Sequence, residues 1–95
     1  MVTETMAATN PLRLLRDQTA QANGGKPVPV RTLAKDAHVA PNTVNRIEQG
    51  LHIPTLIVAR KLVTALAQYD VQAEAYPLIV ALEGWQAGER GGDND

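Results

Sequence analysis

The stretch VRTLAKDAHVAPNTVNRI, from Val30 to Ile47, determines the fold of this chain. Its apolar residues recur three and four positions apart, in two groups around a break at 38–40. They are Leu33, Ala34, Ala37, Val39, Val44 and Ile47. This spacing predicts two short helices, each with one apolar side, and Pro41 suits the first turn of the second helix. Neither helix can bury its apolar side alone, so we expect the two to cross closely, which the small side chains of Ala34 and Ala37 permit.

A close crossing leaves one side of the second predicted helix facing solvent. That side carries Pro41, Asn42, Asn45 and Arg46. The arrangement is a helix-turn-helix, whose second helix fits the major groove of DNA. An arginine can pair with both acceptors of guanine, and an asparagine with the donor and acceptor of adenine. We therefore predict that these four residues contact bases, with Arg46 as the leading reader; the alternative is a polar surface without a reading role.

The same stretch resembles the Cro/repressor-type (XRE-like) helix-turn-helix family, which is common among phage repressors and bacterial regulators. The resemblance runs from about residue 11 to residue 66 and includes LLR at 14–16, RIEQG at 46–50 and PTL at 54–56. It implies an all-α, compact five-helix, lambda-repressor-like DNA-binding domain. It also implies a transcription regulator, a repressor that binds a palindromic operator in double-stranded DNA as a homodimer.

Five further residues are candidates for contact with DNA phosphate: Arg31, Lys35, Thr43, His52 and Thr55. In the family, the connection that holds His52 runs along phosphate, although an exposed loop histidine explains this residue equally well. The family also often pairs the glutamate matching Glu48 with an arginine of the first helix, and Arg16 occupies that position here. Such a structural salt bridge would hold the second motif helix on the domain.

Three positions depart from the family pattern. Val30 stands where a glutamine usually grips phosphate, and His38 stands where the turn usually has glycine. Histidine tolerates a positive φ better than most side chains do. Ala40 replaces the usual serine or threonine cap of the recognition helix, a loss of about 1 kcal/mol of helix stability. These departures affect the expected affinity for DNA more than the expected mode of binding.

The charges are unevenly distributed, although the net charge of the chain is only −1. Eight basic and three acidic residues lie between Pro11 and Leu62, a net charge of +5, whereas one basic and seven acidic residues lie outside. This asymmetry fits a protein with one face that meets phosphate and another that turns away from it. Ordinary solvated charge is the alternative.

The rest of the chain divides into flanking segments. We expect a disordered arm at 1–9, a helix-turn-helix domain at 10–67, a C-terminal helical dimerisation element at 68–87 and a disordered tail at 88–95. Within the domain, the linker at 23–29 is longer than usual and is interpreted as a tolerated flexible insertion.

The apolar and aromatic residues of the C-terminal element are expected to form the dimer interface: Tyr76, Leu78, Ile79, Leu82 and Trp85. The small domain has little core left to receive them, and large apolar patches mark interfaces. In the alternative, this helix folds back on its own domain as a fifth core element, which leaves a monomer or a dimer formed only on DNA.

Other functions find less support in the sequence. Cysteine is absent, and no cluster of metal ligands or pair of nucleophile and base stands out, so we expect no enzyme activity, metal or cofactor. No stretch approaches the length of a membrane span, and we expect a cytoplasmic protein of a bacterial or phage-infected cell. An antitoxin or another protein-interaction module with the same fold, and with a toxin or regulatory protein as its partner, is the alternative function.

Overall fold

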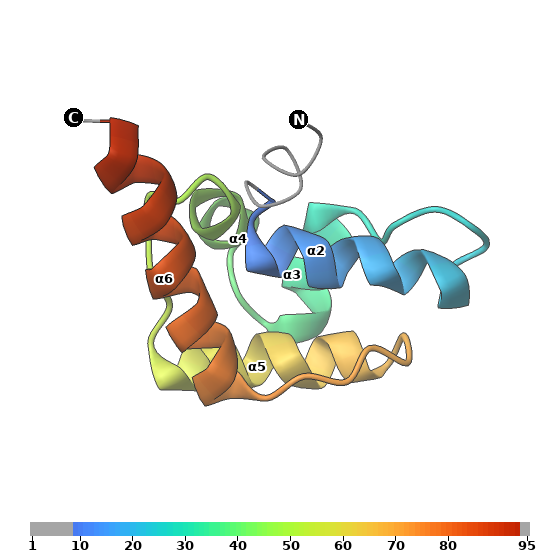
Figure 1. The fold of residues 1–95 in the computed structure, drawn as a ribbon. Helices are drawn as coiled ribbons and strands as arrows, with labels where there is room; N and C mark the ends of the chain where they lie inside the picture. The colour runs from blue at the N-terminus through green and yellow to red at the C-terminus, as the bar shows by residue number, and fades with distance from the viewer. Residues whose placement is uncertain (1–8, 94–95) are drawn as a thin grey trace.

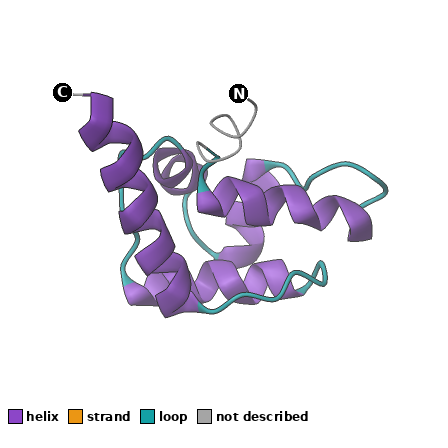
Figure 2. Ribbon diagram, in the orientation of Figure 1, coloured by secondary structure: helices purple, strands orange, loops and turns teal. Residues whose placement is uncertain are grey.

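The computed structural model describes residues 9–93, and side chains as far as Gln86. Within this part of the chain all regular structure is helical (Figures 1 and 2). The elements are α2 (Pro11–Gln18), a 3-10 helix η1 (Thr19–Ala22), α3 (Val30–Ala37), α4 (Pro41–Glu48), α5 (Leu56–Ala67) and α6 (Ala75–Asp93). The predicted all-α fold with five α-helices is confirmed. Helices α3 and α4 cross as a pair, α2 packs on α4, α5 packs on α3, and α6 lies across both α5 and α2.

Side-chain caps or prolines mark the starts of α2, α4 and α5. Asn10 caps α2, since its side-chain oxygen accepts from the backbone N–H groups of Leu12 and Arg13 at 2.8 and 3.1 Å. Proline is the first residue of both α2 and α4, where its missing N–H would have no partner within the helix. Thr55 caps α5 by accepting from the N–H of Val58 at 3.2 Å. The side-chain oxygens of Asn10 and Thr55 accept hydrogen bonds from N–H groups that have no partner within the helix. The two prolines have no N–H group that would need an acceptor.

The turn between α3 and α4 passes through His38, which has a left-handed backbone with φ 59° and ψ 42°. This conformation lets the chain reverse direction in three residues, and it usually falls to glycine because a Cβ strains it. Gly50, at φ 79°, ends the α4 region in the same way. The prediction that histidine accepts the turn position is therefore confirmed.

The core is aliphatic and draws on all five α-helices. Its largest fully buried apolar side chains are Leu12, Val28, Leu33, Val44, Ile47, Leu62, Leu66 and Leu82. Burying one such side chain contributes about 1.5–3 kcal/mol, so this set supplies the main favourable term in folding. Val44 and Ile47 belong to α4, and their complete burial fixes which side of that helix can face solvent.

The assignment of Leu78 and Leu82 to a dimer interface is wrong. They are only 4% and 1% exposed, because the chain after α5 returns beside that helix and lays α6 across α5 and α2 (Figure 1). The first four helices leave one side of the core open, and these two leucines close it. Ile79 and Trp85 are half-buried, while Tyr76 is 69% exposed. The structure instead agrees with the alternative, in which α6 folds back on its own domain as a fifth core element.

The two ends of the chain are predicted from the sequence to be disordered. Helix α6 continues to Asp93, so the tail expected from residue 88 is helical at 88–93. An established helix gains one hydrogen bond for each residue added, and it can extend through residues that would not start one. The arm expected at 1–9 lies outside the described residues except for Thr9.

The linker between η1 and α3 is fastened at Val28, which differs from the interpretation as a flexible insertion. The Thr19 hydroxyl accepts from the Val28 N–H at 2.8 Å and donates to the Arg16 carbonyl at 2.5 Å. Val28 is itself 1% exposed, and its carbonyl accepts from the Arg16 guanidinium at 3.1 Å. The exposed tip at 23–26 is therefore short, and both sides of it are tied to the core.

Two polar contacts join α2 to the C-terminal end of α4, and we call them the α4 clamp. Arg16 donates from Nε to Glu48 Oε2 at 2.7 Å and from Nη2 to Oε1 at 2.9 Å, with side-chain exposures of only 13% and 10%. The Asn10 side-chain nitrogen donates to the Ile47 carbonyl at 3.0 Å in a buried position. The hydrogen bond with Glu48 raises the pKa of Arg16 above its ordinary value. Asn10 thus serves two helix ends, since its oxygen caps α2 while its nitrogen donates to the Ile47 carbonyl in the last turn of α4.

Two other contacts hold the neighbouring elements. The Tyr69 hydroxyl donates to Asp36 Oδ2 at 2.6 Å and so ties the end of α5 to α3. This hydrogen bond raises the pKa of Tyr69. Gln86 of α6 donates from its side chain to the Gly50 carbonyl, directly after α4. The exit of the recognition helix is consequently fixed from α2 and from α6.

We expect strong coupling between Arg16 and Glu48 in a double-mutant cycle built from Arg16→Met and Glu48→Gln. Each single change should lower the free energy of unfolding by about 2–4 kcal/mol, because it leaves a poorly solvated charge without its partner. The coupling energy should reach about 1–3 kcal/mol in urea denaturation.

The exposed pair Arg13 and Asp17 is a matched control in the same helix. Its atoms are 3.6 Å apart and its side chains are 58% and 43% exposed, so its coupling should stay below about 0.5 kcal/mol. Equal coupling energies for the two pairs would show that the clamp contributes no more than a surface ion pair.

Thr19→Val should lower the free energy of unfolding by about 1–3 kcal/mol, because it leaves the buried N–H of Val28 without an acceptor at nearly unchanged volume. Thr32→Val, at an exposed position of α3, is the control and should change stability by less than about 0.5 kcal/mol. Urea denaturation of both variants measures the difference, and a Thr19→Val protein as stable as the control would contradict the anchoring role.

Candidate DNA-binding face

Helix α4 separates its side chains into a buried side and a free side. Val44 and Ile47 have no exposed surface. Asn42, Asn45 and Arg46 are exposed, as is Pro41 at the start of the helix. All four residues predicted to contact bases therefore lie on the solvent side of α4, and we call them the reading face: Pro41, Asn42, Asn45 and Arg46.

Sequence reasoning missed one neighbour of the reading face. Gln49 ends α4 as its C-cap residue and is exposed. It follows Asn45 by four positions and Arg46 by three, so it extends the same side by one turn. Its side-chain amide offers the donor and acceptor pair that suits adenine. The spacing alone was the signal that could have found it.

The candidate phosphate contacts occupy several elements. Arg31 and Lys35 are exposed one turn apart on α3, and His52 is exposed in the connection between α4 and α5. Thr43 is half-buried in the first turn of α4. Thr55 is exposed, and its hydroxyl accepts from the N–H of Val58, so its own proton is the group that it could donate to a phosphate.

The first turn of α4 has no side-chain acceptor, because Ala40 stands at its cap and makes no side-chain hydrogen bond. Among its N–H groups, that of Thr43 bonds to the Ala40 carbonyl at 3.0 Å. Free N–H groups at a helix start favour an anion nearby. Val30, at the position where the family usually has a phosphate-gripping glutamine, packs against the core instead. Val30 therefore cannot make the phosphate contact that the family's glutamine makes. Ala40 leaves the first N–H groups of α4 without a side-chain acceptor.

The clamp keeps the negative charge of Glu48 away from the reading face. Glu48 follows Arg46 by two residues, yet both of its carboxylate oxygens accept from Arg16 on the opposite side. The acid therefore lies in a neutral pair, turned away from Asn45 and Arg46. This leaves the reading face with a guanidinium and amides and without a carboxylate of its own.

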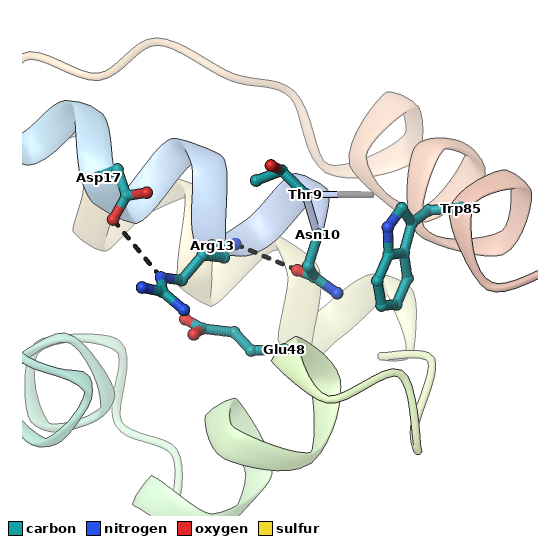
Figure 3. A pocket seen from close by; sticks show the side chains of 6 residues that line it. All are labelled: Thr9, Asn10, Arg13, Asp17, Glu48 and Trp85. Carbon is teal, nitrogen blue, oxygen red and sulfur yellow. Dashed lines mark hydrogen bonds and ion pairs between the residues drawn. The ribbon is translucent and has the colours of Figure 1, made fainter. Parts of the chain in front are cut away.

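A surface pocket of about 330 Å³ lies where α2, the end of α4 and α6 meet (Figure 3). Its walls are Thr9, Asn10, Arg13, Asp17, Glu48 and Trp85. Four of the polar side chains in its lining have partners: Asn10 and Glu48 belong to the clamp, and Arg13 pairs with Asp17. Within the described residues, no three metal-ligating side chains come together, and no helix has the length and apolar character of a membrane span. The pocket therefore lies at a clamped corner of the domain.

The comparison with family models gives one match, to the helix-turn-helix family over residues 30–71. The matched segment covers α3, α4, α5 and the turn that follows, which includes the reading face and the Tyr69 contact. Neither the curated proteins nor the solved structures gave a match. Over residues 30–71, which are less than half of its length, the chain is similar to the helix-turn-helix family, and this match supports a DNA-binding regulator of the Cro/repressor type.

Proposed function

We propose that this protein is a sequence-specific transcription regulator, a repressor that binds a palindromic operator as two copies. The observation that carries the proposal is the division of α4: one side is buried and clamped, while the other presents Asn42, Asn45 and Arg46 to solvent. A rigid helix with free amide and guanidinium groups is what reading of base edges in the major groove requires.

In the proposed complex, α4 enters the major groove with its N-terminal half foremost. Arg46 pairs with guanine, and Asn42 or Asn45 pairs with adenine, each good pair discriminating by about 1–3 kcal/mol. Pro41 gives apolar contact at the edge of the groove. Arg31 and Lys35 on α3 and His52 after α4 meet phosphate, with Thr43 and Thr55 as weaker candidates.

The clamp contributes to recognition by holding α4 in place before DNA arrives. Base pairs are distinguished only if the reading side chains keep their positions relative to the domain. Contacts from Arg16 and Asn10 to the end of α4 limit that movement, so less ordering is needed on binding. Repression then follows from occupancy, since a protein in the groove excludes other proteins from the same site.

Two copies related by a twofold axis would place their α4 helices about 34 Å apart, one turn of DNA, and would require an inverted repeat. The action on DNA places the protein in the cytoplasm of a bacterial or phage-infected cell. The alternative, an antitoxin or protein-interaction module, explains the fold equally well. It gives no reason for the row of base-reading groups on α4, so DNA binding is the better explanation.

Arg46→Ala should reduce the preference for the operator while leaving the fold intact, because the side chain is exposed and, in this proposal, makes the main base contact. The operator would first be selected from random DNA with the wild-type protein. Gel-shift titrations with the selected and the scrambled site, together with circular dichroism, measure the effect. A loss of about 1–3 kcal/mol of discrimination is expected. Unchanged discrimination in a folded variant would exclude Arg46 as the reader.

Arg31→Ala and Lys35→Ala should instead weaken binding to the selected and the scrambled site alike. A lost phosphate contact also lowers the slope of log affinity against log salt by about 1 for each residue. Titrations at several salt concentrations measure the slope. Arg46→Ala is the control, because it also removes one positive charge but removes it from the reading face. A variant that loses discrimination but keeps its slope would contradict the phosphate assignment.

A further inference from the structure

A second surface pocket, of about 310 Å³, lies between the end of α3 and the side of α5, and we call it the α3–α5 pocket. Its volume is at the lower end of the range of small-molecule sites, about 300–1,000 Å³. Its polar lining residues are Asp36, His38, Arg60, Lys61, Thr64 and Gln68. None of them is among the residues that the proposed function places on DNA, so the pocket is a separate feature of the domain.

The α5 wall of the pocket carries two positive charges. Arg60, Thr64 and Gln68 follow one another at intervals of four residues, so they share one side of the helix. Lys61 lies next to Arg60 and borders the same side. Both cations are exposed, and among the described side chains neither has an acidic partner within ion-pair distance. The guanidinium and the ammonium group are therefore available to an anion from solution.

The α3 wall carries one negative charge, on Asp36. Its Oδ2 atom accepts from the Tyr69 hydroxyl at 2.6 Å, and this bond holds the carboxylate in place. No described group donates to its Oδ1 atom, which keeps its lone pairs for a donor from outside the chain. His38 also lines the pocket, and it belongs to the turn that leads into α4. The two walls therefore differ, because α5 offers positively charged donors and α3 offers an acceptor.

This division of charge determines which class of ligand suits the pocket. A simple anion would gain from Arg60 and Lys61 but would meet the carboxylate of Asp36, and a simple cation would meet the reverse. A molecule with a phosphate at one end and hydroxyl groups at the other satisfies both walls. A phosphate monoester carries a charge of about −1.5 to −2 at neutral pH and has three acceptor oxygens, so it matches two cations. A carboxylate in turn accepts hydrogen bonds from sugar hydroxyls, as in the recognition of ribose.

We propose that the α3–α5 pocket binds a small phosphorylated sugar, with the phosphate on Arg60 and Lys61 and a sugar hydroxyl on Asp36. Arginine gives phosphate two parallel N–H donors, and lysine adds a compact positive charge. The Thr64 hydroxyl and the Gln68 amide, on the same side of α5, supply donors for the remaining phosphate oxygens. The site goes beyond the proposed function, because the binding of a sugar phosphate requires no DNA.

An NMR shift titration of the full chain with ribose 5-phosphate tests the site, with ribose and inorganic phosphate as comparison probes. Ribose 5-phosphate should bind at least about tenfold more tightly than either, because only it contacts both walls. Arg60→Gln and Lys61→Gln should each weaken its binding about tenfold, since each removes a charge-assisted hydrogen bond. Lys26→Gln removes the same charge from an exposed position outside the pocket and should bind as wild type does. Circular dichroism checks that the variants fold.

Asp36→Asn tests the α3 wall separately. It removes the charged acceptor for the sugar together with the repulsion of the phosphate. The preference for ribose 5-phosphate over inorganic phosphate should therefore fall about fivefold. Equal wild-type affinity for these two probes would show a general anion site only and would overturn the proposal. Binding of ribose 5-phosphate that survives both Arg60→Gln and Lys61→Gln would overturn it as well.

A last measurement distinguishes a small phosphate ligand from the phosphates of DNA. Arg60→Gln and Lys61→Gln should leave the slope of log affinity against log salt unchanged on the selected DNA site. A slope lowered by about 1 for each residue would assign the two cations to the DNA backbone and would contradict the proposed ligand. A wild-type chain without any DNA sequence preference refutes the proposed function alone, because the sugar-phosphate titration contains no DNA.

Discussion

The structure depends on how the C-terminal end of α4 is held. Arg16 of α2 pairs with Glu48 through two hydrogen bonds, and Asn10, the N-cap of α2, donates to the carbonyl of Ile47. Helix α4 has only eight residues, too few to be stable alone in water. Its burial through Val44 and Ile47 supplies most of its stability, and the polar contacts fix its rotation and its exit. The exposure of the reading face follows from that placement.

The clamp also resolves an electrostatic difficulty. A carboxylate in a recognition helix opposes the approach of a polyanion, and Glu48 lies two residues from Arg46. By pairing with Arg16 on the inner side, Glu48 stabilises the domain and leaves the outer side of α4 without negative charge. The same arginine holds the Val28 carbonyl, so one guanidinium joins α2, the linker and α4. The position of the recognition helix and the course of the linker are therefore coupled.

Helix α6 has one side that belongs to the core and one side that faces solvent. Its inner side completes the core through Leu78 and Leu82, and Gln86 reaches the Gly50 carbonyl just beyond α4. Its outer side carries Tyr76 and Val80, which no described part of the domain covers fully.

Much of the DNA-binding unit was determined by the sequence itself. The apolar spacing predicted α3 and α4, and it placed Asn42, Asn45 and Arg46 opposite the buried side, because a helical period assigns residues to sides without knowledge of neighbours. The Asn10–Pro11 cap and the turns at His38 and Gly50 are local as well. The pairing of Arg16 with Glu48 was suggested by family resemblance, which carries information on distant contacts that spacing alone lacks.

Only the tertiary structure decided what covers each side. The spacing of Leu78 and Leu82 shows that they share a side of α6, but not whether that side meets its own domain or a partner. The path of residues 68–74 beside α5 settled this in favour of the domain. Asn10 with Ile47, Thr19 with Val28, and Tyr69 with Asp36 join residues 9 to 37 positions apart. Such contacts depend on where whole helices lie, and no local pattern of residues encodes that placement.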